Sequence, residues 1–231
     1  MSSAATVGLE GKVIIAIDGP SGSGKSTLGK ALARRLGFLY VDSGAVYRAV
    51  GRKAIDQGLS LEDHEALERV AVEAAIKLIG DPDSQRVLLD GRDVTAEIRL
   101  PDASNASSVV ATVPGVRRAV IEKLRAMARE SNVVMDGRDI GTKVFPDAKV
   151  KLFLDASVDV RARRRCDEER QRGREISFED VRAEIEERDR RDRERAATPL
   201  VKADDAIEID SSWLSVDDVV GRVLEIMKAG G

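Results

Sequence analysis

A glycine-rich segment near the N-terminus constrains the fold more than any other part of this 231-residue chain. The pattern G-x-x-x-x-G-K-[ST] is matched by Gly19-Pro20-Ser21-Gly22-Ser23-Gly24-Lys25-Ser26 and followed by Thr27. It lies between an apolar run that predicts a strand and a segment that predicts a helix. Glycines let backbone N–H groups converge on phosphate oxygens, Lys25 neutralises the β- and γ-phosphates, and the Ser26 hydroxyl can ligate Mg²⁺. The segment therefore predicts a loop that binds a nucleoside triphosphate.

Five short apolar runs, each ending in aspartate, predict buried parallel strands. They are Val13–Asp18, Phe38–Asp42, Val133–Asp136, Val150–Asp155 and Ala206–Asp210. The crossovers that parallel pairing requires are predicted as helices at Lys25–Leu36, Gly44–Gln57, Leu61–Ile79, Pro114–Glu130, Ser157–Arg172, Ser177–Arg195 and Ser215–Lys228. Ligands of open α/β sheets bind beyond the carboxyl ends of the strands, so the acidic ends mark the functional edge. We expect at least two of these aspartates only to cap a helix or turn.

The expected organisation is one α/β core interrupted by an insertion. The core is assigned to residues 12–60 and 131–231, the insertion to residues 61–130, and a flexible tail to residues 1–11. The insertion contains Val87-Leu-Leu-Asp90-Gly91-Arg-Asp-Val94, whose Asp-Gly step between apolar residues predicts a small antiparallel element.

The composition argues against several classes of protein and site. A net charge of -3, from 38 Lys+Arg against 41 Asp+Glu, gives no overall positive field, so we expect no nucleic-acid partner. Cys166 and His64 are the only residues of their types, which argues against disulfides, cysteine-rich metal sites and histidine-based triads. No secretory signal and no apolar run near the ~20 residues of a membrane helix is present. We expect a cytoplasmic monomer that does not bind membranes, with His64 on the surface of a helix.

An arginine-rich segment follows the fourth predicted strand. Residues 161–195 contain 13 Arg, 12 Asp+Glu and no Lys, and apolar residues nearly vanish after Ile185. A helix with so little apolar surface is either a solvated rod held by ion pairs or a mobile element that closes over an anion. The exclusive use of the planar, always charged guanidinium favours the second reading. We therefore expect residues 157–195 to form a helical lid.

Two polar clusters follow predicted strands at the functional edge. They are Asp42-Ser43-Gly44-Ala45-Val46-Tyr47-Arg48 and Asp136-Gly137-Arg138-Asp139-Ile140-Gly141. An aspartate in the place of Asp136 can hold Mg²⁺ through water while Arg138 faces a second phosphate. Taken alone, both clusters also fit simple caps and tight turns.

Together with Gly19–Thr27 and Arg188-Asp-Arg-Arg-Asp192-Arg-Glu-Arg195, these clusters closely resemble, in order and spacing, the bacterial cytidylate kinases, a family of nucleoside monophosphate kinases. The resemblance runs from about Val13 to Leu200 and is weakest over residues 60–100. It implies a five-stranded parallel core, an inserted monophosphate-binding region and a lid that closes on ATP. The implied reaction transfers the γ-phosphoryl group of Mg²⁺-bound ATP to CMP or dCMP.

The resemblance also implies roles for single residues. The acceptor's phosphate would be held by Ser43, Arg48, Arg138, Arg188 and Arg195, and the sugar hydroxyl by Asp192. The base would be bound by Ser108, Arg117 and Asp139, and ATP by Arg161 and Arg165. The residues around the moving phosphoryl group would be Lys25, Arg138, Arg188 and Asp136. Cytosine presents an N4 donor beside its N3 and O2 acceptors, which a carboxylate and an arginine complement. Uracil would turn its O4 acceptor towards that carboxylate, so the pair is expected to discriminate against UMP.

Two other functions stay open on the sequence alone. The same core could serve a kinase for another small acceptor. It could also serve a module that hydrolyses a nucleoside triphosphate and binds nucleic acid, although the nearly balanced charge of residues 161–195 argues against this. A guanine-binding Asn-Lys-x-Asp motif is absent, because neither Asn105 nor Asn132 precedes a lysine.

Overall fold

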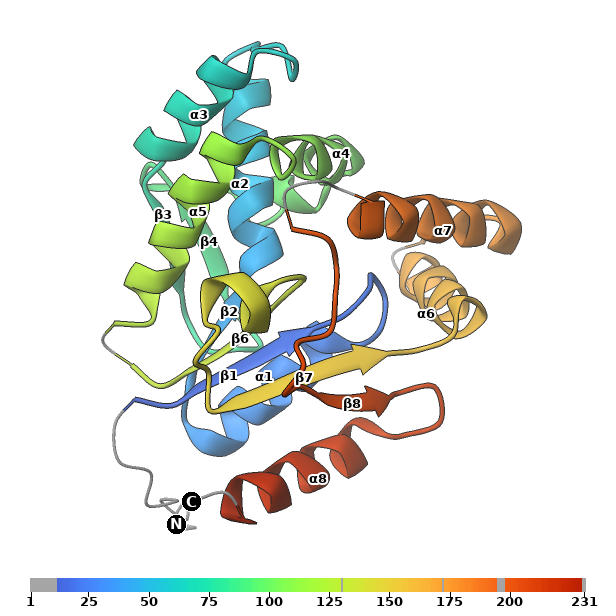
Figure 1. The fold of residues 1–231 in the computed structure, drawn as a ribbon. Coiled ribbons are helices and arrows are strands. Elements are labelled where there is room, and N and C mark those ends of the chain that lie inside the picture. The colour runs from blue at the N-terminus through green and yellow to red at the C-terminus, as the bar shows by residue number, and fades with distance from the viewer. Residues whose placement is uncertain (1–11, 130, 172, 195–197, 230–231) are drawn as a thin grey trace.

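Five parallel strands in the order β2-β6-β1-β7-β8 form the central sheet (Figure 1). The computed structural model describes residues 12–129, 131–171, 173–194 and 198–229. Its sheet consists of β1 (Ile14–Asp18), β2 (Leu39–Asp42), β6 (Val133–Gly137), β7 (Val150–Asp155) and β8 (Ile207–Asp210). All five predicted strands are confirmed to within one residue at either end.

Helices cover both faces of this sheet and explain why its strands are apolar throughout. On one face lie α1 (Lys25–Leu36) and α8 (Val216–Ala229), below the sheet in Figure 1. Above it lie α2 (Ser43–Asp56), α3 (His64–Glu73), α4 (Pro101–Val110) and α5 (Pro114–Met127). Successive residues of β1 serve opposite layers: Ala16 packs in the apolar cluster of α2 and α5, whereas Ile15 and Ile17 pack with α1 and α8. Both faces of the sheet are therefore core.

The segment between α2 and β6 contains a second, antiparallel sheet. It consists of β3 (Ile76–Ile79), β4 (Arg86–Leu89) and β5 (Arg92–Asp93). The predicted hairpin is confirmed: Asp90 and Gly91 connect β4 to β5 with φ angles of 51° and 85°, the positive values that a tight two-residue turn requires. The boundaries of the core and the insertion stay a prediction.

In this segment one helix prediction is wrong, and one helix was not predicted. The helix expected over Leu61–Ile79 begins only at His64 and ends at Glu73, because the residues after it form β3 and pair with β4. The exposed position of His64 is confirmed. Helix α4 was not predicted, since Ser and Asn give it a weak intrinsic preference for helix. It forms by close packing on α2, where a Cβ added to Gly51 would lie 3.0 Å from the Ala106 Cβ atom.

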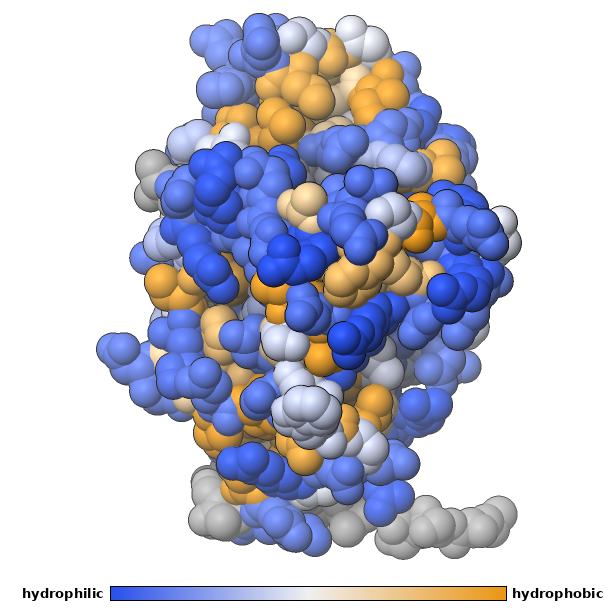
Figure 2. All heavy atoms as spheres, turned by 90° about the vertical axis from the view of Figure 1, so that its right-hand side faces the viewer, coloured by the Kyte–Doolittle hydropathy of each residue, from blue (hydrophilic) through white to orange (hydrophobic). Residues whose placement is uncertain are grey.

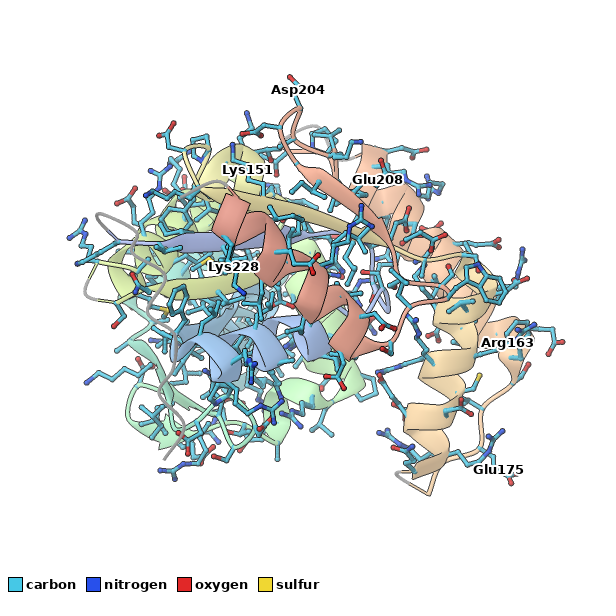
Figure 3. The ribbon with its side chains drawn as sticks, turned by 90° about the horizontal axis from the view of Figure 1, so that it is seen from below. Lys151, Arg163, Glu175, Asp204, Glu208 and Lys228 are labelled. Atoms are coloured by element: carbon cyan, nitrogen blue, oxygen red, sulfur yellow. The ribbon has the colours of Figure 1, made fainter. Side chains whose placement is uncertain are left out.

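The arginine-rich segment forms two helices, α6 (Val158–Gln171) and α7 (Phe178–Glu194), beside the carboxyl ends of the strands (Figure 1). Figure 2 looks onto this side of the molecule, where hydrophilic side chains predominate. Figure 3 shows Arg163 on α6 and Glu175 in the turn beyond it, both away from the sheet. None of the helices in the described part of the chain is long and apolar enough to cross a membrane.

A buried ion pair joins α6 to α7. Arg161, only 2% exposed, donates from Nη1 and Nη2 to the two carboxylate oxygens of Asp189 at 3.1 and 2.6 Å. The apolar contact between these helices is small and centres on Ala162, Val181 and Ile185. The ion pair is therefore a second contact between α6 and α7, and removing either charge would leave the other buried without a partner.

The first testable prediction concerns this pair. Asp189→Ala leaves the buried Arg161 charge without its carboxylate, a change that typically costs roughly 3–5 kcal/mol. Native-state hydrogen exchange of the α6 and α7 amides should then accelerate by about a hundredfold or more, since each 1.4 kcal/mol is a factor of ten. Glu194→Ala, which removes a partner of exposed Arg190, is the control and should change exchange less than about fivefold. Equal effects of both variants would contradict the assignment.

Candidate active site

The phosphate loop connects β1 to α1, as predicted, and its glycines take conformations that other residues avoid. Gly19, Gly22 and Gly24 have φ angles of 149°, 78° and 90°. A Cβ at Gly19 would lie 2.0 Å from the Leu154 carbonyl oxygen, so no side chain fits there. Lys25, 6% exposed, folds back over this loop, and its Nζ atom donates to the Pro20 carbonyl oxygen.

Asp136, at the end of β6, connects three parts of the functional edge. The Ser26 hydroxyl donates to its Oδ2 atom at 2.8 Å, and the Tyr40 hydroxyl donates to its Oδ1 atom at 3.1 Å. The Ser43 hydroxyl donates to its backbone carbonyl oxygen at 2.7 Å. The pKa of the Asp136 carboxyl is raised to about 6, first by burial and then by the nearby Asp42 charge, while the Lys25 charge opposes this shift. The helix start after the phosphate loop and β2 are thus bonded to the Asp136 carboxylate, and the start of α2 is bonded to the Asp136 backbone carbonyl.

Positive charges converge beside this carboxylate. Burial lowers the pKa of Lys25 to about 7, with contributions from the Arg138 and Arg188 charges. Burial also lowers the pKa of Arg188 to about 10, with Arg138 as the strongest of the repelling charges. Carboxylates balance part of this charge: Arg138 Nε donates to Asp192 Oδ2 at 2.8 Å, and Arg48 Nη2 donates to Asp42 Oδ2 at 2.7 Å. Repelling cations at one edge make a site in which bound anions are favourable.

Arg117 and Asp139, the two charged residues predicted to contact the base, lie against each other in the structure. Arg117 and Asp139 are 4% and 5% exposed, and Arg117 Nη2 donates to Asp139 Oδ2. The Arg117 guanidinium also lies 5.8 Å from the centre of the Tyr47 ring and donates to the Ala111 carbonyl oxygen at 3.2 Å. Ser108 is half-buried on α4, where its hydroxyl donates to the Ser104 carbonyl oxygen at 3.3 Å.

The two arginines predicted to hold ATP differ in their surroundings. Arg161 Nη1 donates to the Ser21 carbonyl oxygen of the phosphate loop at 3.1 Å, in addition to its pair with Asp189. Arg165 is exposed and pairs with Glu168 and Glu169 of its own helix. Arg195, predicted to bind the acceptor's phosphate, lies outside the described residues, as do residues 1–11, predicted to form a tail.

Sequence reasoning missed several partners of these groups. Nothing in the sequence marks Asp189 as the partner of Arg161, because it is one of many alternating charges in α7. Arg164 donates from Nη2 to the Ser211 carbonyl oxygen at 2.7 Å, and the Ser211 hydroxyl donates to the Ser23 carbonyl oxygen of the phosphate loop at 2.9 Å. The expectation that at least two strand-end aspartates are caps is confirmed: Asp42 accepts from Ala45 N at 3.0 Å and Asp210 from Ser212 N at 2.8 Å.

Residues 15–229 match the family model described as cytidylate kinase. The chain belongs to the cytidylate kinase family. It is 51% identical over 217 residues to the cytidylate kinase of Pelotomaculum thermopropionicum, which covers 94% of this chain and 96% of that relative. It is 49% identical over 216 residues to the cytidylate kinase of Desulforamulus reducens, covering 94% and 97%. The resemblance of the motifs to this family is thereby confirmed.

A comparison of structures agrees on the fold. The crystal structure of an uncharacterized protein from Eubacterium ventriosum matches with a TM-score of 0.53 at 14% sequence identity, covering 94% of this chain and 99% of that protein. At this identity the match shows only that the two chains share a fold.

The second testable prediction follows from the lowered pKa of Lys25. At pH 8 a lysine with a pKa of about 7 is mostly neutral, whereas Asp136, with a pKa of about 6, is already ionised. A bound triphosphate favours the ammonium form, so binding of a nonhydrolysable ATP analogue with saturating Mg²⁺ should take up protons at pH 8 and much less at pH 6. Calorimetry in buffers of different ionisation enthalpy measures this uptake.

Lys25→Arg is the control for that titration. Arginine keeps the positive charge but does not titrate between pH 6 and pH 8, so the uptake at pH 8 should disappear in this variant while binding persists. Uptake of the same size in Lys25→Arg would contradict the assignment to Lys25.

Proposed function

We propose that the protein transfers the γ-phosphoryl group of ATP to CMP or dCMP, giving CDP or dCDP and ADP. The observation that carries this proposal is that Lys25, Arg138 and Arg188 lie close enough to repel one another: after burial, which is the largest cause, the neighbouring positive charges lower the pKa of Lys25 and of Arg188. Lys25 belongs to the phosphate loop, whereas Arg138 follows β6 and Arg188 lies on α7. A cation of the proposed ATP site therefore lies close to cations of the proposed acceptor site, as a transfer between two bound phosphates requires.

The proposed mechanism relies on positioning and charge. Lys25, Arg138 and Arg188 stabilise the negative charge of the moving phosphoryl group, and Ser43 and Arg48, with Arg195 by resemblance, orient the acceptor's phosphate in line with it. Asp192, which pairs with Arg138, is proposed to meet the sugar hydroxyl. No general base is needed, because the acceptor oxygen of a monophosphate is already ionised near neutral pH. Most of the rate enhancement then comes from holding two anions together.

The donors at the Ser26–Asp136 contact fit Mg²⁺. No cluster of three or more His, Cys, Asp or Glu residues suited to a metal occurs in the described part of the chain. Mg²⁺ in such enzymes is bound by one or two carboxylates together with substrate phosphates and water, so a lone hydroxyl beside a buried carboxylate is sufficient. We propose that Ser26 holds the ion directly and Asp136 through water, and that the ion neutralises charge on the β- and γ-phosphates.

The lid is proposed to exclude water. Arg161 already contacts the phosphate loop through Ser21, and exposed Arg165 lies one helical turn further along α6. Ordering of α6 and α7 over both nucleotides would bring Arg165 and Arg188 to the phosphates and suppress hydrolysis of ATP. A cytoplasmic location and a monomeric state stay predictions from the sequence.

The third prediction tests the reaction itself. Acceptor-dependent formation of ADP from Mg²⁺-ATP should occur with CMP and dCMP, and be weak with UMP, AMP and shikimate offered separately. ATP alone should be hydrolysed far more slowly than transfer occurs. Turnover confined to another acceptor would contradict the cytosine assignment, and hydrolysis without acceptor preference would point to a nucleoside triphosphatase.

The fourth prediction tests the base pocket. Asp139→Asn replaces a carboxylate oxygen by an N–H₂ group, which no longer accepts from cytosine N4 but can donate to uracil O4. The ratio of kcat/KM for CMP to that for UMP should fall by roughly ten- to a hundredfold, the discrimination expected of one misplaced polar contact. Lys25→Ala is the comparison, because it should depress transfer to both acceptors without changing their ratio. An unchanged ratio in Asp139→Asn would remove this residue from base recognition.

A further inference from the structure

Asp18 is a buried carboxylate that neither the motifs nor the proposed mechanism uses. It ends β1, directly before the phosphate loop, and is 5% exposed. Its Oδ1 atom accepts from the Ile140 backbone N–H at 2.8 Å, and its Oδ2 atom accepts from the Gly141 backbone N–H at 2.7 Å. Both bonds connect residues more than a hundred positions apart, across the pairing of β1 with β6.

These two N–H groups belong to the first turn of a π-helix, Ile140–Val144, that follows β6. The first N–H groups of a helix have no partner within the helix and are normally capped by the side chain of the preceding residue. Asp139 occupies that N-cap position and is a residue type that caps well, yet its side chain makes no capping bond. Its carboxylate instead pairs with Arg117 in the proposed base pocket.

We propose that Asp18 is a positioning residue that caps this π-helix in place of Asp139 and so keeps the Asp139 carboxylate directed at the acceptor's base. The inference rests on the proposed role of Asp139 in base recognition. Without the Asp18 carboxylate, the N–H groups of Ile140 and Gly141 lose their partner. Asp139 is the residue at the N-cap position, whose side chain ordinarily supplies such a bond. That side chain would turn back to cap the helix and leave Arg117.

The surroundings of Asp18 support a fixed geometry. A Cβ added to Gly141 would lie 3.4 Å from Asp18 Oδ2 and 3.3 Å from Lys151 side-chain carbons, so this close approach leaves little space for a larger residue. Lys151, labelled in Figure 3, lies on β7, and its Nζ atom forms an ion pair with Asp205 Oδ2 at 2.7 Å. Burial raises the pKa of Asp18 to about 6, the Asp139 charge also raises it, and both N–H bonds and Lys25 oppose the shift. At pH 7.5 the group is therefore ionised and both oxygens accept.

The test uses Asp18→Asn, which keeps one acceptor oxygen but turns an N–H₂ group against the second backbone N–H. The measured quantity is the ratio of kcat/KM for CMP to that for UMP at pH 7.5. This ratio does not depend on the fraction of folded enzyme, so a merely destabilised variant keeps the wild-type value. We expect the ratio to fall at least about tenfold, comparable to the loss of a hydrogen bond to a charged group.

A double-mutant cycle with Asp139→Asn separates the proposed route from others. If Asp18 acts through Asp139, the ratio in Asp18→Asn/Asp139→Asn should equal that in Asp139→Asn alone. Asp155→Asn is the matched control, because Asp155 also ends a strand at this edge and its side chain accepts, within the described part of the chain, from Ala156 N at 2.8 Å and not from the π-helix. Its CMP:UMP ratio should stay within about twofold of the wild-type ratio, as a cap without a link to the base pocket requires.

The outcomes separate this inference from the proposed function. A wild-type CMP:UMP ratio in Asp18→Asn overturns the inference. An additive loss of this ratio in the double variant also overturns it, because Asp18 would then act independently of Asp139. A wild-type ratio in Asp139→Asn overturns the base-recognition role itself, and the positioning role with it.

Discussion

The parallel pairing of β1 with β6 is the contact on which the rest of the site depends. It sets Asp18 opposite Gly137 and Ile17 opposite Asp136, so the phosphate loop after β1 and the polar cluster after β6 leave the sheet side by side. Without this register, Ser26 could not reach Asp136 and Asp18 could not reach Ile140. Two segments that are distant in sequence thereby become one surface at the carboxyl ends of the strands, where ligands of such sheets bind.

Charge is the second organising feature, and it is distributed unevenly. Lys25, Arg138 and Arg188 repel one another where the phosphate loop meets the end of β6 and α7, and Asp192 balances part of this charge by pairing with Arg138. Arg161, Arg117 and Arg48 are paired with the carboxylates of Asp189, Asp139 and Asp42. The bidentate pair of Arg161 and Asp189 connects the two helices of the lid, because removing either charge leaves the other buried without a partner. Bound anions would relieve the repulsion among Lys25, Arg138 and Arg188, whereas Arg161 already has its counter-ion in Asp189. This difference separates Arg188 from Arg161 within residues 161–195, where the sequence alone does not distinguish one arginine from another.

The helices of the insertion show where local sequence is insufficient. The apolar spacing of Leu67, Val70, Ala71 and Ala74 continues as a helical pattern into Ile76–Ile79. These residues instead pair with β4, which places Ile76 opposite Leu89 in the same apolar cluster. Helix α4 is the reverse case, since its weak propensity is overcome by small residues that let it approach α2 closely. In both cases the outcome depends on a neighbour that is not adjacent in the chain.

The sequence by itself determined the parallel sheet, the phosphate loop, the hairpin at Asp90-Gly91 and the residue types of the proposed acceptor site, because hydrophobic period, turn chemistry and motif spacing are local properties. Tertiary structure alone decided that Arg161 is held by Asp189, that Arg117 faces Asp139, and that Asp18 takes over the cap that Asp139 would otherwise supply. Each of these choices is a competition between partners for one charged or polar group. Such competitions are settled by distance and burial, which exist only once the strands have paired and the helices have packed.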